Sequence, residues 1–213
     1  MTPGRFITLE GIEGAGKSTV AKFAREWLEG RGKRVTLTRE PGGTPLAERV
    51  RQLVLDRQGE PITPPTETLL MFAARREHLE LVIRPALTRG DWVVCDRFTD
   101  ATYAYQGGGH GVPASRIRDL EQWVHPDCQP DLTFLFDVPT GVSRARLDSA
   151  ELAGRSLDKF EREASEFFTR VRSTYLERAG AFAQRIRVID STRPVNVVQA
   201  ELATHLAALG LPT

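Results

Sequence analysis

The 213-residue chain is 40% hydrophobic and carries 29 basic against 28 acidic residues, a formal net charge of +1. This length and apolar content suffice to bury one substantial core, so we expect a single α/β domain over residues 1–213. The balanced charge argues against a nucleic-acid surface or an anionic membrane as the main partner. No apolar stretch approaches the ~20 residues that a transmembrane helix needs.

Cysteine content and the start of the chain bear on the compartment. The only two cysteines are Cys95 and Cys128, and the first lies inside an apolar run, so no disulfide framework is indicated. A strand that begins by Phe6 leaves no room for a signal peptide. We therefore expect a reducing compartment, the cytoplasm. Arginine is abundant, with 25 residues against four lysines, so one arginine near a motif is weak evidence of function.

The hydrophobic pattern alternates between strand and helix periodicities. Five apolar runs are typical of buried strands: Phe6–Glu10, Arg34–Thr38, Trp92–Asp96, Leu132–Val138 and Ile186–Asp190. Helical spacing occurs from Lys17 to Leu28 and over Pro45–Leu55, Thr66–Arg89, Ser115–Val124, Leu157–Phe182 and Val195–Leu209. Strands that alternate with helices predict a five-stranded parallel sheet covered on both faces, a three-layer α/β/α fold.

The turn between the first strand and the first helix carries the strongest motif. Residues 11–18 read G-I-E-G-A-G-K-S, which matches G-x-x-x-x-G-K-[ST] with the expected strand and helix on either side. Backbone N–H groups of such a loop surround phosphate oxygens, and the helix N-terminus adds partial positive charge. Lys17 can reach the β- and γ-phosphates, and the Ser18 hydroxyl can coordinate Mg²⁺. The motif predicts binding of a nucleoside triphosphate.

Residues just after the other strands are candidates for the same site, because ligands of parallel α/β sheets bind outside the carboxyl ends of the strands. Arg39 enters a loop with Pro41 and paired glycines, where it could hold an anion, although a plain tight turn explains the loop equally well. Asp96 ends a strand at the usual position of an acid near Mg²⁺, with Arg97 beside it. A strand-end salt bridge is the alternative for this pair.

Two further segments are open to more than one interpretation. The glycine-dense stretch Tyr105–Gly111 suits either close backbone approach or a plain flexible loop. The stretch Ser143–Asp158 contains Arg144, Arg146 and Arg155, which could close over a triphosphate and neutralise charge on the transferred group. Chance placement is as good an explanation for any one of these arginines.

Five segments taken together resemble thymidylate kinases of the bacterial kind. They are F-I-T-L-E-G-I-E-G-A-G-K-S-T at residues 6–19, T-R-E-P-G-G-T at 38–44, L-L-M-F-A-A-R-R-E-H at 69–78, D-R-F-T-D-A-T-Y-A-Y-Q-G-G-G at 96–109 and L-D-K-F-E at 157–161. The resemblance implies a P-loop nucleoside monophosphate kinase that transfers phosphate from MgATP to dTMP, giving dTDP and ADP for dTTP synthesis. It also implies a homodimer.

The resemblance assigns roles to individual residues. Phe72 matches the aromatic that stacks on thymine, and Arg76, on the same helix face, matches the residue that hydrogen-bonds the base. Arg39 and Arg97 match arginines that hold the monophosphate. The positions expected to contact the base, sugar or acceptor phosphate also include Glu13, Thr102, Tyr105 and Gln106. The ATP loop is expected to comprise Gly11, Ile12, Glu13, Gly14, Ala15, Gly16, Lys17, Ser18 and Thr19, and Mg²⁺ is expected at Ser18 and Asp96. The Glu40–Pro41 bond is expected to be cis.

Thymidylate kinases place a catalytic arginine either in the phosphate loop or in the lid. The loop here has no arginine, so the chain resembles the lid design, with a lid over about 141–157. The expected catalytic set is Lys17, Arg97, Arg155 and Arg146, the last two ranked ahead of Arg144. Two departures from the family are a longer segment from 146 to 158 and Asp158-Lys159 in place of Asp-Arg.

Three alternatives are compatible with a phosphate loop. Another nucleoside monophosphate kinase differs only in its acceptor. A GTPase switch could use the D-x-x-G at Asp56–Gly59, but its guanine-reading N-K-x-D is impossible, since Val197 follows the sole asparagine, Asn196. A regulatory ATPase would release ADP without dependence on an acceptor.

Overall fold

Five parallel strands form one sheet at the centre of the computed structural model, which describes residues 4–56, 60–156 and 158–210. The strands are β1 (Phe6–Glu10), β2 (Val35–Arg39), β3 (Trp92–Asp96), β4 (Leu132–Asp137) and β5 (Ile186–Asp190), in the spatial order β2-β3-β1-β4-β5. Leu9 pairs with Asp96 on one side and Phe134 on the other. The sequence-based prediction of a five-stranded parallel sheet is confirmed, with shifts of one residue at some strand ends.

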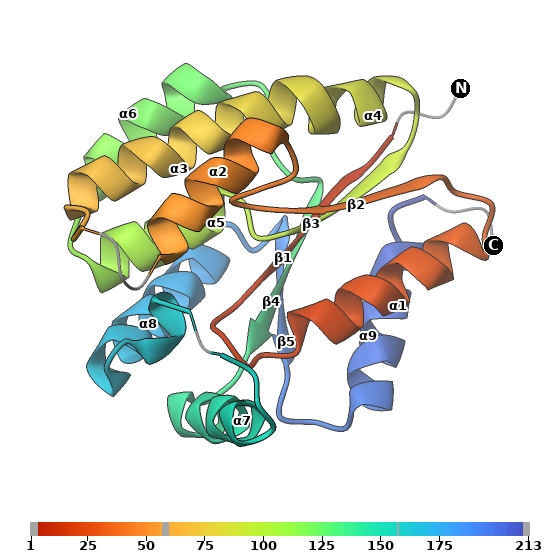
Figure 1. Cartoon of the computed structure of the whole chain (residues 1–213). Helices are drawn as coiled ribbons and strands as arrows, with labels where there is room; N and C mark the ends of the chain where they lie inside the picture. The colour runs from red at the N-terminus through yellow and green to blue at the C-terminus, as the bar shows by residue number, and fades with distance from the viewer. Residues whose placement is uncertain (1–3, 57–59, 157, 211–213) are drawn as a thin grey trace.

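Helices cover both faces of the sheet (Figure 1). Helices α1 (Lys17–Glu29) and α9 (Val195–Ala207) pack together on one side. The other side carries α2 (Pro45–Leu55), α3 (Pro64–His78), the short α4 (Arg84–Thr88), α6 (Ala114–Val124) and α8 (Ser165–Ala181). A π-helical stretch, η1 (Leu79–Ile83), joins α3 to α4, so the predicted helix over 66–89 is one continuous helical run.

The side chains of β1 alternate between the two faces of the sheet, so this short strand contacts the helices of both layers. Ile7 and Leu9 lie in the hydrophobic cluster that includes α1 and α9, whereas Phe6 points into a second cluster with Leu79 and Ile117. All three β1 side chains are at most 1% exposed. Burial of a side chain of this size contributes about 1.5–3 kcal/mol. The same pleat therefore fixes the register of β1 and the position of the loop that follows it.

The glycine-dense segment after β3 is helical. Residues Thr99–Thr102 form α5, and Tyr103–Gly109 continue as a π-helical stretch, η2. A Cβ on Gly108 would lie 2.1 Å from Oγ1 of Thr174, and one on Gly109 would lie 2.4 Å from the ring of Phe167. The flexible-loop interpretation is therefore wrong. The glycines allow close backbone approach, and the neighbour they approach is helix α8.

The helix that follows the predicted lid begins later than the sequence predicts. Helix α7 spans Thr140–Leu152, a 3-10 turn η3 spans Phe160–Arg162, and α8 begins only at Ser165, whereas the sequence predicts one helix from residue 157, which lies outside the described residues. The backbone N–H of Glu161 donates to Oδ1 of Asp158 (3.0 Å), and that of Asp158 donates to Oε2 of Glu161 (2.9 Å). These reciprocal bonds close a separate turn before α8.

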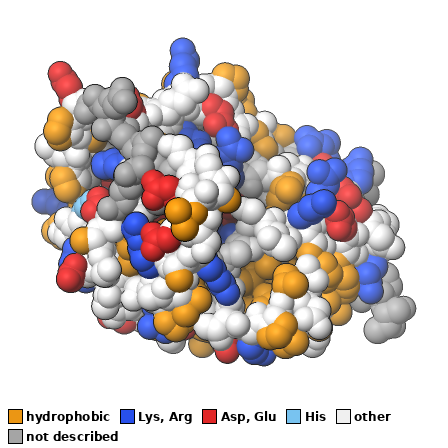
Figure 2. All heavy atoms as spheres, turned by 60° about the horizontal axis from the view of Figure 1, so that its bottom comes forward, with side chains coloured by type: hydrophobic (Ala, Val, Ile, Leu, Met, Phe, Trp, Pro, Cys, Tyr) orange, Lys and Arg blue, Asp and Glu red, His pale blue; other side chains and the backbone are white. Residues whose placement is uncertain are grey.

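Surface properties agree with the balanced composition. Basic and acidic side chains are interspersed over the face that Figure 2 shows, which is the face that carries the carboxyl ends of the strands. Within the described ranges, no helix is long and apolar enough to cross a membrane.

Candidate active site

A cavity of about 680 Å³ opens where β1 and β3 end. Its wall is built from the loop after β1, the residues after β3, helix α3, helix α7 and the segment that precedes α8. The cavity is thus at the position that the parallel sheet favours for a ligand. Six of the nine predicted ATP-loop residues line it: Glu13, Gly14, Gly16, Lys17, Ser18 and Thr19. The side chains of Ile12 and Ala15 point into the core instead.

The loop itself has the backbone that phosphate binding requires. Gly11 has φ +136°, and a Cβ there would lie 2.5 Å from the carbonyl oxygen of Phe136. Gly16, at φ +87°, immediately precedes α1. The Lys17 ammonium is buried and donates to the carbonyl oxygens of Gly11 (2.9 Å) and Ile12 (3.0 Å). Burial, and then the neighbouring Arg97, lower the pKa of Lys17.

Asp96 and Ser18 fit a magnesium site. Oδ1 of Asp96 is buried and has no hydrogen-bond partner in the described part of the chain, and both residues line the cavity. No cluster of three or more His, Cys, Asp or Glu side chains that could hold a metal occurs among the residues described. Mg²⁺ is commonly held by one or two carboxylates together with substrate phosphates and water, and this donor set is of that kind.

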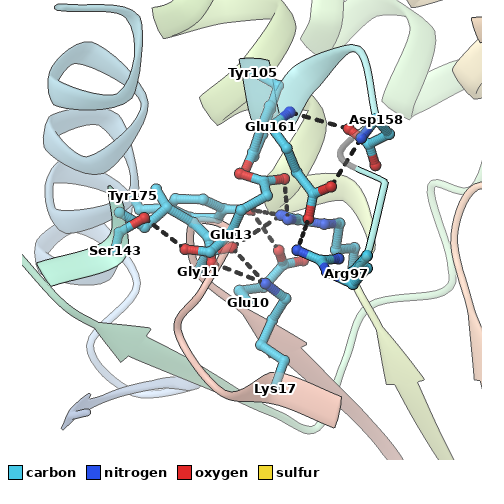
Figure 3. A network of polar contacts seen from close by, with 12 residues as sticks. Glu10, Gly11, Glu13, Lys17, Arg97, Tyr105, Ser143, Asp158, Glu161 and Tyr175 are labelled. Carbon is cyan, nitrogen blue, oxygen red and sulfur yellow. Dashed lines mark hydrogen bonds and ion pairs between the residues drawn. The ribbon is translucent and has the colours of Figure 1, made fainter. Parts of the chain in front are cut away.

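Arg97 links the phosphate loop to Tyr175 of helix α8 (Figure 3). Its Nη1 donates to the Gly11 carbonyl oxygen (2.9 Å) and to the Tyr175 hydroxyl (3.2 Å), and its Nη2 lies 2.6 Å from Oε1 of Glu13. The Tyr105 hydroxyl donates to the other Glu13 oxygen (2.5 Å). Arg97 has φ +71°, the single positive φ among described non-glycine residues. Such backbone strain is typical of functional sites.

A buried acid, Glu10, lies behind this network and was not recognised from the sequence. Its two carboxylate oxygens accept from the Phe98 backbone N–H (2.7 Å) and from the Tyr175 hydroxyl (2.8 Å). Burial, with a smaller contribution from Asp100, raises the pKa of Glu10 to about 8. Glu10 therefore exchanges a proton near neutral pH while it orients the tyrosine that contacts Arg97.

Helix α3 presents a different pair of residues to the cavity from the predicted pair. Met71 and Arg75 line the cavity, four residues apart on one helix face. Phe72 is 2% exposed, stacks on His125 and lies beneath the Arg75 guanidinium. Arg76 points away, donating to the Val124 carbonyl oxygen and pairing with Glu80. The structure therefore brings neither Phe72 nor Arg76 to the cavity, because one residue of offset turns a side chain by about 100° around a helix.

Arg75 is held rigidly and keeps one donor free of protein partners. Its Nε donates to Glu40 (2.7 Å) and its Nη2 to the Thr102 hydroxyl (3.0 Å), whereas the buried Nη1 has no acceptor in the described residues. Burial alone would raise the pKa of Glu40, but the Arg75 charge and the hydrogen bond from His78 lower it. Thr102, Tyr105 and Gln106, which the sequence predicts at the acceptor, line the same cavity.

The arginines divide into those that reach the cavity and those that do not. Arg39 pairs with Glu48 (2.9 Å), its side chain is 52% exposed and it does not line the cavity, so the structure does not bring this predicted phosphate ligand to the site. Arg51, on α2, lines the cavity and donates to the Pro41 carbonyl oxygen. Of the arginines before α8, Arg146 and Arg155 line the cavity, whereas Arg144 pairs with Asp148. Arg146 also donates to the Gly14 carbonyl oxygen (2.9 Å).

Comparisons with known proteins agree over nearly the whole length of the chain. The family model described as thymidylate kinase matches residues 9–202. The chain is 58% identical to a thymidylate kinase of Bordetella pertussis, covering 98% of both chains, and 59% identical to one of Methylobacillus flagellatus, covering 93% of this chain and 95% of that one. This chain belongs to the thymidylate kinase family.

A solved structure supports the same assignment at the level of the fold. The crystal structure of a thymidylate kinase from Ehrlichia chaffeensis matches with a TM-score of 0.77 and 38% identity, covering 96% of this chain and 99% of that one. The cis Glu40–Pro41 bond that the thymidylate kinase resemblance implied is present. Glu10, Arg51, Met71 and Arg75 are among the cavity and network residues that sequence reasoning missed. Glu10 ends a strand as Asp96 does, and could have been found by that rule.

Proposed function

We propose that this member of the thymidylate kinase family transfers the γ-phosphoryl group of MgATP to the 5′-phosphate of dTMP, giving dTDP and ADP. One observation carries the proposal: the phosphate loop, Arg97 and Arg75 line the same cavity, and the buried Nη1 of Arg75 has no acceptor among the described residues. A triphosphate at the loop and a base at Arg75 therefore place the two reacting phosphates near Arg97.

The proposed binding site for ATP, the phosphoryl donor, is the loop after β1. Its backbone N–H groups and the N-terminus of α1 bind the ATP phosphates. In the structure, Lys17 donates to two loop carbonyl oxygens, and binding of ATP exchanges these weak partners for phosphate oxygens. Mg²⁺ held by Ser18 and Asp96 would supply charge neutralisation at the transferred group.

The proposed binding site for dTMP, the phosphoryl acceptor, is formed by helix α3 and η2. Arg75 offers Nη1 to a carbonyl oxygen of the base, and the side chain of Met71 offers an apolar surface for one face of the ring. A buried charged donor that is left without an acceptor costs more free energy than one ordinary hydrogen bond contributes. A base with a carbonyl oxygen at that point is therefore preferred. The Tyr105 ring lies at the sugar, where it would crowd a ribose 2′-hydroxyl.

Phosphoryl transfer needs positioning and charge neutralisation more than covalent chemistry, because the acceptor oxygen is already an anion. Arg97 and Arg51 supply positive charge from the sheet side and from α2. Arg146 and Arg155 supply it from the segment over the cavity, which also limits access of water. Arg155 is 50% exposed and pairs with the buried Glu161, whose other oxygen accepts from the Asp158 backbone N–H, so a move of Arg155 to the transferred phosphate exchanges one anionic partner for another.

The nearest rival is a nucleoside monophosphate kinase with another acceptor. An assay that couples ADP release to a spectroscopic signal separates the two when dTMP, dUMP, dCMP and GMP are compared at saturating MgATP. We expect dTMP to give the highest kcat/KM. A higher value for a purine monophosphate would contradict the proposed acceptor.

Two further properties complete the proposal. We propose a homodimer, supported by large apolar side chains exposed on neighbouring helical segments: Leu69 of α3, Leu81 of η1 and Trp123 of α6 are 55%, 58% and 80% exposed. Analytical ultracentrifugation tests it, since Trp123→Glu should shift a dimer toward monomer. We propose the cytoplasm as the compartment, which accords with two buried thiols, Cys95 and Cys128, that form no disulfide.

A further inference from the structure

A buried carboxylate on helix α3, Glu67, contacts three elements around the acceptor half of the cavity. Its side chain is 1% exposed. Nε2 of Gln106 donates to Oε1 (2.9 Å), Nζ of Lys159 donates to Oε2 (2.7 Å), and Nε2 of His110 lies 3.6 Å from Oε1. Glu67 does not line the cavity, whereas Gln106 does. Gln106 is therefore the partner of Glu67 that can contact a ligand directly.

The contact with Glu67 fixes which end of the Gln106 amide faces the ligand. An ionised carboxylate accepts hydrogen bonds and cannot donate them. The amide nitrogen of Gln106 must therefore face Glu67, and the ammonium of Lys159 donates to the other carboxylate oxygen. The planar amide turns Oε1 of Gln106 away from Glu67, and one N–H of the amide is engaged by the carboxylate. Gln106 thus has Oε1 as the acceptor that it can offer to the cavity it lines.

This acceptor complements the orphaned donor of Arg75. Together they match a base edge that carries a carbonyl oxygen beside a ring N–H, as in a 4-oxopyrimidine. A 4-aminopyrimidine has the opposite pattern, an amino group beside an unprotonated ring nitrogen. A glutamine with no partner could turn its amide by 180° and donate to that nitrogen at little cost. With Glu67 in place, the turned amide would set its carbonyl oxygen against a carboxylate.

We propose that Glu67 is a specificity-determining positioning residue, which holds the Gln106 amide so that the enzyme accepts a 4-oxopyrimidine monophosphate and rejects the 4-amino one. The inference rests on the proposed function, because it concerns the acceptor of the same reaction. It adds a role for a side chain that touches no substrate. It also ties base selection to Lys159, in the segment that follows the lid helix.

The test compares dTMP with dCMP in wild-type enzyme and in Glu67→Gln. The glutamine side chain keeps the size but can donate as well as accept, so the Gln106 amide is free to turn. We expect the ratio of kcat/KM for dTMP to that for dCMP to fall about tenfold, the worth of one hydrogen-bond preference. The change should lie in KM for the acceptor, while KM for ATP stays unchanged. Glu121→Gln is the matched control, a buried acid on α6 that bonds Tyr103 and Gln129 and should leave the ratio unchanged.

A second variant separates positioning from a purely structural role. The double variant Glu67→Gln with Gln106→Glu exchanges the two side chains. It puts a carboxylate, which only accepts hydrogen bonds, at the cavity, and an amide that can donate at position 67. We expect it to recover the dTMP preference that Glu67→Gln loses. If Glu67 served only to pair with Lys159, the exchange would recover nothing. The exchange also serves as the test if Glu67→Gln alone does not fold.

The outcomes distinguish the inference from the function on which it rests. If wild-type enzyme fails to phosphorylate dTMP, the proposed function is wrong. If wild-type enzyme phosphorylates dTMP, and Glu67→Gln folds with the wild-type ratio of dTMP to dCMP, the positioning role alone is overturned.

Discussion

Nη2 of Arg97 lies 2.6 Å from Oε1 of Glu13, so the end of β3 is joined directly to the phosphate loop. Both side chains are largely shielded from solvent, at 18% and 11% exposure, which makes this pair stronger than an ordinary surface ion pair. In the proposed reaction, the positive charge of Arg97 lies between the phosphates of ATP and the acceptor phosphate. An acceptor phosphate would compete with Glu13 for the same guanidinium.

The first prediction concerns Arg97→Ala. Loss of a charge that stabilises the transferred group should lower kcat by about 10²–10³, whereas ATP affinity, set by the phosphate loop, should stay near wild type. Coupled ADP release measures the first quantity, and titration with a fluorescent ATP analogue measures the second. Arg144→Ala is the control, since Arg144 does not line the cavity. Unchanged turnover in Arg97→Ala would refute the role of this residue.

The second prediction separates Met71 from Phe72. Met71→Ala removes an apolar wall of the cavity and should raise KM for dTMP about tenfold, equivalent to about 1.4 kcal/mol of binding. Phe72→Leu keeps most of the buried volume and should leave KM for dTMP close to wild type, with stability lowered by about 1 kcal/mol.

Steady-state kinetics at a temperature well below both melting transitions checks the pair. If Phe72→Leu raised KM more than Met71→Ala did, the base would stack on Phe72 as the sequence alone suggested.

The third prediction concerns pH. Burial raises the pKa of Glu10 to about 8 in the folded state, against 4.5 as its ordinary value. Between these values the folded protein binds a proton that the unfolded chain does not, so the contribution of Glu10 to the free energy of unfolding falls as pH rises from about 4.5 to 8. Glu10→Gln mimics the protonated form and should flatten this dependence. Melting temperatures measured from pH 5 to 8 check it, and parallel curves for the two proteins would count against the prediction.

The fourth prediction concerns the packing of η2 on α8. Gly108→Ala forces a Cβ into the Thr174 side chain and the Arg170 backbone, so we expect a loss of about 1–3 kcal/mol in the free energy of unfolding. For a chain of this size the melting temperature should fall by roughly 2–4 °C per kcal/mol. Gly141→Ala, where an added Cβ meets nothing within 4 Å, is the matched control. Equal melting temperatures for the two variants would mean that η2 does not pack on α8 as described.

The sequence predicts what depends on local pattern. The phosphate loop is set by glycines at fixed spacing between a strand and a helix, and the strands by apolar runs, so both were recoverable without a structure. Met71 and Phe72 show the limit, because both are apolar neighbours and only the way α3 docks decides which one faces the ligand. Arg39 and Arg51 show a second limit. The chain has 25 arginines, so positive charge alone does not identify the arginine that lines the cavity.

Long-range contacts explain the remaining differences. The glycines at 107–109 read as a loop because nothing near them in sequence reveals that α8 packs against their backbone. The role of Glu10 depends on Tyr175, which is 165 residues away. Glu67 likewise gains its partners from η2 and from the segment before α8.

The most direct measurement follows the γ-phosphoryl group itself. Purified protein is incubated with Mg²⁺, γ-³²P-labelled ATP and dTMP, and the labelled products are separated. We predict that the label appears in dTDP, that its appearance requires both dTMP and Mg²⁺, and that Lys17→Ala abolishes it. Label found in inorganic phosphate at a rate independent of dTMP would contradict the account.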